Sequence, residues 1–205
     1  MFTRTAVIRT FVCFEIPTYV RDHLATIQER LRKSDVEVSW VKVGNIHLTV
    51  EFLGGVSLDR MESVNQGIGR AAEKGQPIRL ELAKLGCFPN LEHPRVIWVG
   101  PRQVPDALAI FYHRVKKELT AAGFSIQSRP FSPHFTLGRV RARRKIDTLA
   151  RAIKRENLEP VSFRLTKVTV MASQQNSVGI LYTPISRSTL GCPPLNRNSL
   201  QSVFG

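Results

Sequence analysis

The chain has 205 residues, of which 42% are hydrophobic and 22% are charged, as in ordinary soluble globular proteins. No apolar run approaches the roughly 20 residues of a membrane helix, which excludes a protein anchored by such helices. The 30 Lys and Arg outnumber the 16 Asp and Glu, and the net charge of +14 favours a polyanionic partner, nucleic acid before an anionic membrane surface. A basic protein without such a partner is the alternative.

The N-terminal segment and the cysteines indicate a cytoplasmic protein. Arg9 and Glu15 cut the apolar stretches of "MFTRTAVIRTFVCFEIP" too short for the hydrophobic region of a signal peptide. The three cysteines, Cys13, Cys87 and Cys192, are far apart, odd in number and without CxxC spacing. We therefore expect inert thiols, with no disulfide framework and no zinc site.

The first half of the chain is predicted to contain strands and amphipathic helices. Apolar residues at helical spacing predict helices at 18–33 and 57–74, the second with Ser57 as its N-cap. Strands are predicted at 7–16, 38–43 and 45–55.

The second half repeats these components. Helices are predicted at 104–122, ending before Gly123, and near 145–157. The predicted strands are 78–88, 95–100, one within 128–140, 161–172 and 178–185.

The mixture of strands and helices lacks a regular βαβ alternation and indicates an α+β fold with largely antiparallel sheets. Residues 1–186 are predicted to form one domain. Residues 187–205 contain prolines and polar residues without periodicity, and we expect them to form a poorly ordered tail.

Two strands carry the same polar pair. In "NIHLTVEFLGG", the residues Ile46, Leu48, Val50 and Phe52 share one face, so that His47 and Thr49 share the other. "SPHFTLGRV" repeats the pattern 87 residues later with His134 and Thr136. The repetition predicts a duplicated, two-lobed protein with pseudo-twofold symmetry and a site between its lobes.

Two such pairs, facing each other, suit displacement at phosphorus. One imidazole takes a proton from water while the other protonates the leaving oxygen, and the hydroxyls hold the non-bridging oxygens. Positioning and charge stabilisation supply most of the catalysis of phosphoryl transfer, and this arrangement needs no metal. A single H-x-T on a strand is usually structural, whereas two matched copies favour one shared site.

"NIHLTVEFLGGV" and "RPFSPHFTLGRV" resemble the paired signatures of the two-histidine (2H) phosphoesterases, and above all their RNA 2′,3′-cyclic phosphodiesterase or 2′-5′ RNA ligase-like branch. "RTFVCFEIP", "RVIWVG", "VTVMAS" and "GILYTPI" extend the resemblance over residues 7–185. It implies a two-lobed α+β fold with the active site in the cleft. It also implies hydrolysis of a terminal 2′,3′-cyclic phosphate on RNA to a 2′-phosphate, with reversible 2′-5′ joining of RNA ends in some members.

The resemblance also implies roles for individual residues. His47 is the general acid for the leaving 3′ oxygen and His134 the base for water, although the sequence alone does not fix this division. Thr49 and Thr136 bind the phosphate. Arg139 matches a phosphate-binding arginine, but strict alternation puts it on the Phe135 face, so that its role requires a bulge near Gly138.

Further residues are candidates for RNA contacts. Phe11, Phe14 and Trp40 could stack on a base or serve as core residues. The basic run "GRVRARRK" contains Arg141, Arg143 and Arg144, which we interpret as a track for the RNA backbone rather than a solvated loop.

Other functions stay open. The same site could act on small cyclic nucleotide phosphates or on 2′-5′ linked oligonucleotides, or the protein could be an RNA-binding module without turnover. A metal-dependent hydrolase is disfavoured because the sequence has no HxxxH and no DxD. A monomer without a cofactor is expected, since the two lobes complete the site.

Overall fold

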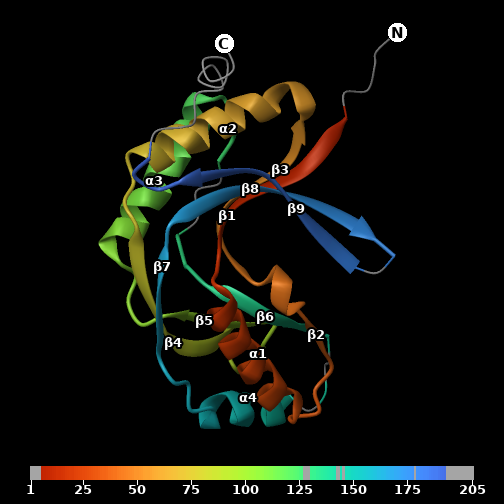
Figure 1. Ribbon diagram of the computed structural model, residues 1–205. Coiled ribbons are helices and arrows are strands. Elements are labelled where there is room, and N and C mark those ends of the chain that lie inside the picture. The colour runs from red at the N-terminus through yellow and green to blue at the C-terminus, as the bar shows by residue number, and fades with distance from the viewer. Residues whose placement is uncertain (1–5, 127–129, 142–143, 145, 178, 193–205) are drawn as a thin grey trace, which may run out of the picture.

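The computed structural model describes residues 6–126, 130–141, 144, 146–177 and 179–192 (Figure 1). The strands are β1 (Val7–Glu15), β2 (Val38–Trp40), β3 (His47–Ser57), β4 (Ile78–Phe88), β5 (Val96–Pro101), β6 (Phe135–Val140), β7 (Val161–Leu165), β8 (Lys167–Asn176) and β9 (Gly179–Thr189). They form one antiparallel sheet in the order β7-β4-β5-β6-β3-β1-β8-β9, with β2 paired to β6. The predicted α+β class with antiparallel pairing is confirmed.

Helices cover the outside of this curled sheet (Figure 1). They are α1 (Thr18–Arg32), α2 (Leu58–Glu73), α3 (Asp106–Ala121) and α4 (Ile146–Arg155). Helices α2 and α3 pack against each other and over β3, while α2 also contacts β8 and β9. Helices α1 and α4 contact each other beside the other end of the sheet. Within the part of the chain that the structure describes, each helix is too short or too polar to cross a membrane.

The strand order is symmetric about the β6–β3 junction. On one side lie β3, β1, β8 and β9, the first half-sheet, and on the other lie β6, β5, β4 and β7, the second half-sheet. The junction is a single residue pair, Leu48 opposite Phe135. These are the central residues of the two H-x-T motifs, so that the pseudo-twofold axis passes between them. The predicted duplication into two lobes is confirmed.

The two faces of the first half-sheet have different neighbours. Its outer face, with Val12 and Phe14, belongs to one large apolar core that runs through both half-sheets and buries the helices. Its inner face carries a separate small cluster of Phe11, Cys13 and Met171, packed against Tyr182. Because successive strand residues alternate between faces, residues 11, 13 and 15 of β1 lie on this inner face, after Arg9.

The C-terminal predictions need two corrections. The single strand predicted at 161–172 is wrong: it is interrupted at Thr166, where β7 in the second half-sheet gives way to β8 in the first. Apolar alternation slips by one residue at the crossing: Leu165 and Val168 are buried in the same core, with the exposed Thr166 and Lys167 between them. The tail predicted from 187 also begins too early, since β9 extends to Thr189 and the next residue, Leu190, is buried. Residues 193–205 lie outside the described residues.

Candidate active site

Both motif histidines are held in the same way. Nδ1 of His47 lies 2.7 Å from the carbonyl oxygen of Asn45, and Nδ1 of His134 lies 2.7 Å from that of Ser132. A carbonyl oxygen only accepts, so each Nδ1 carries a hydrogen and donates it. In the neutral imidazole this leaves Nε2 with a free lone pair. The repeated contact to the residue two positions earlier orients both Nε2 atoms for proton transfer.

The junction between the half-sheets brings the two motifs together. Leu48 and Phe135 are the bridged pair, and the antiparallel register, extended by one residue, places His47 opposite Thr136 and Thr49 opposite His134. The two histidines are then diagonal neighbours, about 7–8 Å apart in a regular ladder. The hydroxyl of Thr49 lies 3.1 Å from Nε2 of His47 and donates to it while the ring is neutral.

A bulge follows each motif at the same position. On β3, Val12 pairs with Glu51 and Cys13 with Thr49, so that Val50 is the extra residue. On β6, Ile97 pairs with Gly138 and Trp98 with Thr136, so that Leu137 is the extra residue. A bulge reverses which face the later side chains occupy.

The second bulge is the one that a role for Arg139 requires. Beyond Leu137 the alternation shifts, and Arg139 returns to the face of Thr136. Its position after Gly138 suits this arrangement, because a Cβ on Gly138 would lie 2.6 Å from Cγ1 of Val38 on β2. The charge of Arg139 adds to the lowering of the pKa of His134 that burial causes, and it opposes the rise that burial causes in the pKa of Tyr182, as expected of a guanidinium on this face.

Burial lowers the pKa of each histidine. At His47 the hydrogen bond to Asn45 opposes the effect of burial, and the charge of His134 lowers the pKa further. At His134 the bond to Ser132 opposes burial, and Arg139 adds to the lowering. Both imidazoles are therefore biased toward the neutral form that a general base requires.

Aromatic rings surround both histidines. Phe11 is stacked on His47 with ring centroids 4.9 Å apart, and Tyr182 meets His47 edge-on at 5.3 Å. Phe88 meets His134 edge-on at 4.9 Å. Since Phe11 is only 3% exposed, its ring supports the histidine and offers no open face to a base. Phe52, which is 65% exposed and 6.0 Å from Phe11, occupies in the first motif the place that Arg139 holds in the second.

The structure places the other sequence candidates differently. Phe14 is fully buried in the core, against Phe111. Trp40 lies on β2 beside Gly138, and the guanidinium of Arg32 covers its ring at 4.9 Å. Arg141 and Arg144 are exposed beyond the end of β6. Arg143 lies outside the described residues.

Sequence reasoning missed Trp98, which is cross-strand from Thr136. Its indole ring lies across two glycines: a Cβ on Gly86 would be 2.7 Å from the ring, and one on Gly100 would be 3.0 Å from it. The ring stacks on Phe88 at 5.0 Å and lines an open pocket of about 650 Å³. Its Nε1 is buried without a hydrogen-bond partner among the described residues. The two glycines that make room for this ring lie on different strands, so the sequence does not show that they are neighbours of the tryptophan. The only sequence signal for this segment was the resemblance of "RVIWVG" to a family motif.

Among the described residues, no three His, Cys, Asp or Glu side chains gather closely enough to hold a metal ion. The chemistry that the arrangement offers is proton transfer by two imidazoles that lie diagonally across the β3–β6 junction, with two hydroxyls and one guanidinium on the same face.

Comparisons with known proteins agree with this geometry. Residues 20–177 match the family described as the 2′-5′ RNA ligase superfamily. The chain is 29% identical over 177 residues to an RNA 2′,3′-cyclic phosphodiesterase of Methanothermobacter thermautotrophicus, covering 86% of this chain and 95% of the relative. It is 30% identical over 162 residues to a protein of the same name from Aeropyrum pernix, covering 78% and 90% of the two chains.

Solved structures are similar as well. The crystal structure of Escherichia coli LigT in complex with 3′-AMP superposes with a TM-score of 0.74 at 25% identity, covering 91% of this chain and all of that chain. A Thermus thermophilus protein superposes with a TM-score of 0.72 at 23% identity, covering 90% and 98% of the two chains, and supports the fold alone.

Proposed function

Because this chain belongs to the 2′-5′ RNA ligase superfamily, we propose that it hydrolyses a terminal 2′,3′-cyclic phosphate on RNA to a 2′-phosphate. The observation that carries the proposal is the single bridge between Leu48 and Phe135, which sets both H-x-T motifs on either side of one point. The proteins named RNA 2′,3′-cyclic phosphodiesterase, to which most of this chain is similar, support the same reaction.

In the proposed reaction the two histidines act from opposite sides of the phosphorus. Nε2 of neutral His134 accepts a proton from water as the water attacks in line with the leaving 3′ oxygen. Protonated His47 gives its Nε2 proton to that oxygen. Each Nδ1 stays bonded to its carbonyl throughout, which fixes the ring orientation. With an RNA 5′-hydroxyl in place of water, the same groups in the same roles would join ends through a 2′-5′ linkage, and they would exchange roles when that linkage is cleaved again.

The negative charge of the phosphate is held by donors beside the histidines. The hydroxyls of Thr49 and Thr136 and the guanidinium of Arg139 are the candidates, and all three lie on the histidine face of their strands. The hydroxyl of Thr49 already contacts Nε2 of His47, so that it can turn from the ring to a phosphate oxygen. Trp98 and Phe52 are the candidate stacking surfaces for bases.

The direct test uses an RNA oligonucleotide that ends in a 2′,3′-cyclic phosphate, with EDTA present. We expect conversion to a 2′-phosphate, mapped by digestion or NMR. A 3′-phosphate product would show that the 2′ oxygen leaves instead of the 3′ oxygen. Binding of RNA without turnover by the folded protein would instead favour an RNA-binding module, and dependence on a divalent cation would favour metal chemistry.

The lowered histidine pKa values predict the pH profile. For kcat/KM, activity requires His47 protonated and His134 neutral, and burial lowers both pKa values from about 6.5. The profile should therefore be bell-shaped with its maximum on the acid side of about 6.5. A bound anionic phosphate stabilises both imidazolium forms, so the kcat profile should lie at higher pH. A kcat/KM that rises steadily from pH 6 to 8 would contradict the assignment of His47 as acid.

The exposed arginines after β6 predict a salt effect. If Arg141 and Arg144 each contact an RNA phosphate, replacing both by Gln should weaken binding and reduce the slope of log affinity against log salt by about 1.4. The measurement is a fluorescence-anisotropy titration at several salt concentrations. Lys74→Gln with Lys117→Gln, an equal charge change at exposed positions directly after α2 and on α3, is the control. If the two double variants had the same slope of log affinity against log salt, the proposed contacts of Arg141 and Arg144 with RNA phosphates would be rejected.

We further propose that the protein acts as a monomer in the cytoplasm. Both histidines come from one chain, and so the site is complete without a second copy.

A further inference from the structure

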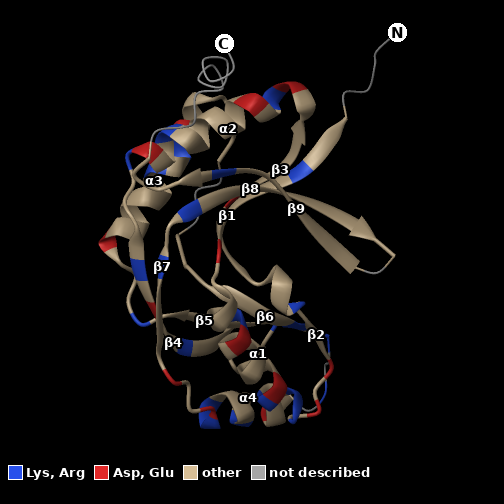
Figure 2. Cartoon of the chain, in the orientation of Figure 1, with Lys and Arg blue, Asp and Glu red and all other residues tan. Residues whose placement is uncertain are grey.

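A second, smaller pocket lies where the chain crosses between the half-sheets. Its walls come from the connection between β1 and α1 and from the connection between β7 and β8, and its volume is about 270 Å³. Its charged lining consists of four cationic side chains and one carboxylate: Arg21, Arg164, Lys167, Arg187 and Glu15. Strands β8 and β9, which form part of the wall, carry no acidic residue, as the absence of red along them in Figure 2 shows. The pocket therefore suits an anion.

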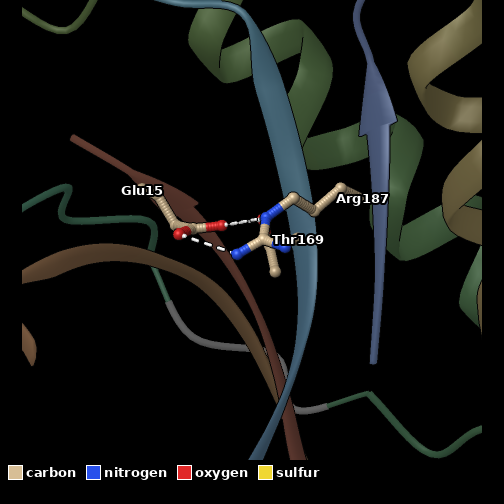
Figure 3. A network of polar contacts seen from close by, with 3 residues as sticks. All are labelled: Glu15, Thr169 and Arg187. Atoms are coloured by element: carbon tan, nitrogen blue, oxygen red, sulfur yellow. Dashed lines mark hydrogen bonds and ion pairs between the residues drawn. The ribbon is translucent and has the colours of Figure 1, made fainter. Parts of the chain in front are cut away.

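One of the cations is fixed in place. Nε of Arg187 lies 2.8 Å from Oε1 of Glu15, and a second guanidinium nitrogen lies 3.3 Å from Oε2, so that the pair is two-pronged (Figure 3). The hydroxyl of the buried Thr169 donates to the same Oε1 at 2.8 Å. The hydrogen bond from Arg187 lowers the pKa of Glu15, which keeps the carboxylate ionised. Three strands, β1, β8 and β9, thus hold the guanidinium rigidly at the pocket.

A second cation has unused donor capacity. Nε of Arg21, on the first turn of α1, is buried and has no hydrogen-bond partner among the described residues. Helix α1 begins beside it with no acidic residue in its first turn, so the positive end of the helix adds to the field. A buried donor without a partner is costly, and an anion in the pocket would satisfy it.

The pocket is adjacent to the proposed acid. Glu15 is directly opposite His47 in the β1–β3 register, on the same inner face. In the proposed reaction His47 protonates the 3′ oxygen, which is attached to the ribose of the terminal nucleotide. The nucleoside must then lie on the His47 side of the phosphorus, and the next phosphate along the chain hangs from its 5′ oxygen.

From this placement we infer that the pocket binds the 5′-phosphate of the terminal nucleotide, the phosphodiester next to the cyclic phosphate. The inference rests on the proposed function and adds a substrate preference to it. A substrate that carries this second phosphate gains charge-assisted contacts that a bare nucleoside cyclic phosphate lacks. The preference for RNA ends over free cyclic nucleosides would thus arise at this pocket.

The test compares two mononucleotides that differ by one group: a nucleoside 2′,3′-cyclic phosphate with a 5′-hydroxyl and the same molecule with a 5′-phosphate. We expect the wild type to prefer the 5′-phosphorylated compound about tenfold or more in kcat/KM. In Arg164→Gln/Lys167→Gln, which leaves the Glu15–Arg187 pair intact, this ratio should fall toward one. An unchanged ratio in the double variant, or no preference in the wild type, would overturn the inference.

A matched control removes the same charge elsewhere. Lys154→Gln/Arg155→Gln lies on α4, whose following residue Glu156 pairs with Arg30 near the far end of α1. Arg30 is thirteen positions after Pro17, the N-cap of α1, which corresponds to about 20 Å along the helix. This variant should keep the wild-type ratio.

A binding measurement separates the two proposals. Calorimetry with the nucleoside 2′-phosphate, with and without a 5′-phosphate, requires no turnover. If the 5′-phosphorylated compound binds more tightly, and if this difference is lost in Arg164→Gln/Lys167→Gln, the pocket is supported. This holds even if neither substrate is hydrolysed, and in that case only the proposed reaction is rejected. Equal binding of the two compounds by the wild type would reject the pocket.

Discussion

Replacing His134 by Ala, or His47 by Ala, should lower kcat on an RNA 2′,3′-cyclic phosphate about 10²–10⁴-fold, the usual contribution of one positioned acid or base. KM should change much less, because the threonines and Arg139 still hold the phosphate. The double variant should lose little more than either single variant, since the two groups act in one transition state. Single-turnover kinetics with excess enzyme measure the residual rates.

The chain offers a matched control for this experiment. His113 is exposed on α3, outside the inner face of the sheet, and its replacement by Ala should leave kcat unchanged. Circular dichroism should show the same fold in all variants. If either motif variant retained wild-type kcat, the paired mechanism would be rejected.

Arg139→Gln should have the second-largest effect. One donor aimed at the charge that develops on a phosphate or oxyanion is commonly worth about 10²–10³ in rate. The bulge at Leu137 turns this side chain toward His134, so that the loss should appear in kcat as well as in KM. Removing the cation should also raise the pKa of His134, because Arg139 lowers it. The acid limb of the pH profile should therefore move to higher pH.

Two further variants test whether this effect is specific to the guanidinium of Arg139. Arg139→Lys keeps the charge but not the fork geometry, and should recover the position of the acid limb while restoring only part of the rate. Arg141→Gln removes a neighbouring charge beyond the bulge and should leave the pH profile unchanged. An Arg139→Gln enzyme with wild-type kcat and an unshifted acid limb would exclude contact with the phosphate.

The sequence predicted those features of the fold and the site that follow from the local alternation of apolar and polar residues. Alternation in 45–55 and 134–140 assigned His47 and His134 to strand faces, and their duplication predicted the symmetric halves that the β3–β6 junction confirms. The same alternation indicated that Arg139 needed a bulge, because a strand without one would place it on the wrong face. The register shift at Leu137 supplies it.

The features that the sequence did not predict depend on contacts between residues that are far apart in the chain. Glu15 and Arg187 are 172 positions apart, and only the β1–β8–β9 pairing makes them neighbours. The break at Thr166 shifts the apolar alternation by one residue, but such a shift does not say which half-sheet the following strand joins. Trp98 was passed over because the glycines that make room for its ring lie on two different strands, β4 and β5.

The order in which the strands occur along the chain has a consequence for biosynthesis. The first half-sheet is built from segments far apart in the sequence: β1 and β3 leave the ribosome before the strands of the second half-sheet, β4 to β7, and β8 and β9 follow after these. Until they arrive, β1 has an unpaired edge open to other strands. The surroundings of His47, including Tyr182 and the Glu15–Arg187 pair, are completed only by these last strands. A nascent chain therefore carries both motifs well before it can possess a finished site, and its final strands complete and protect the first half together.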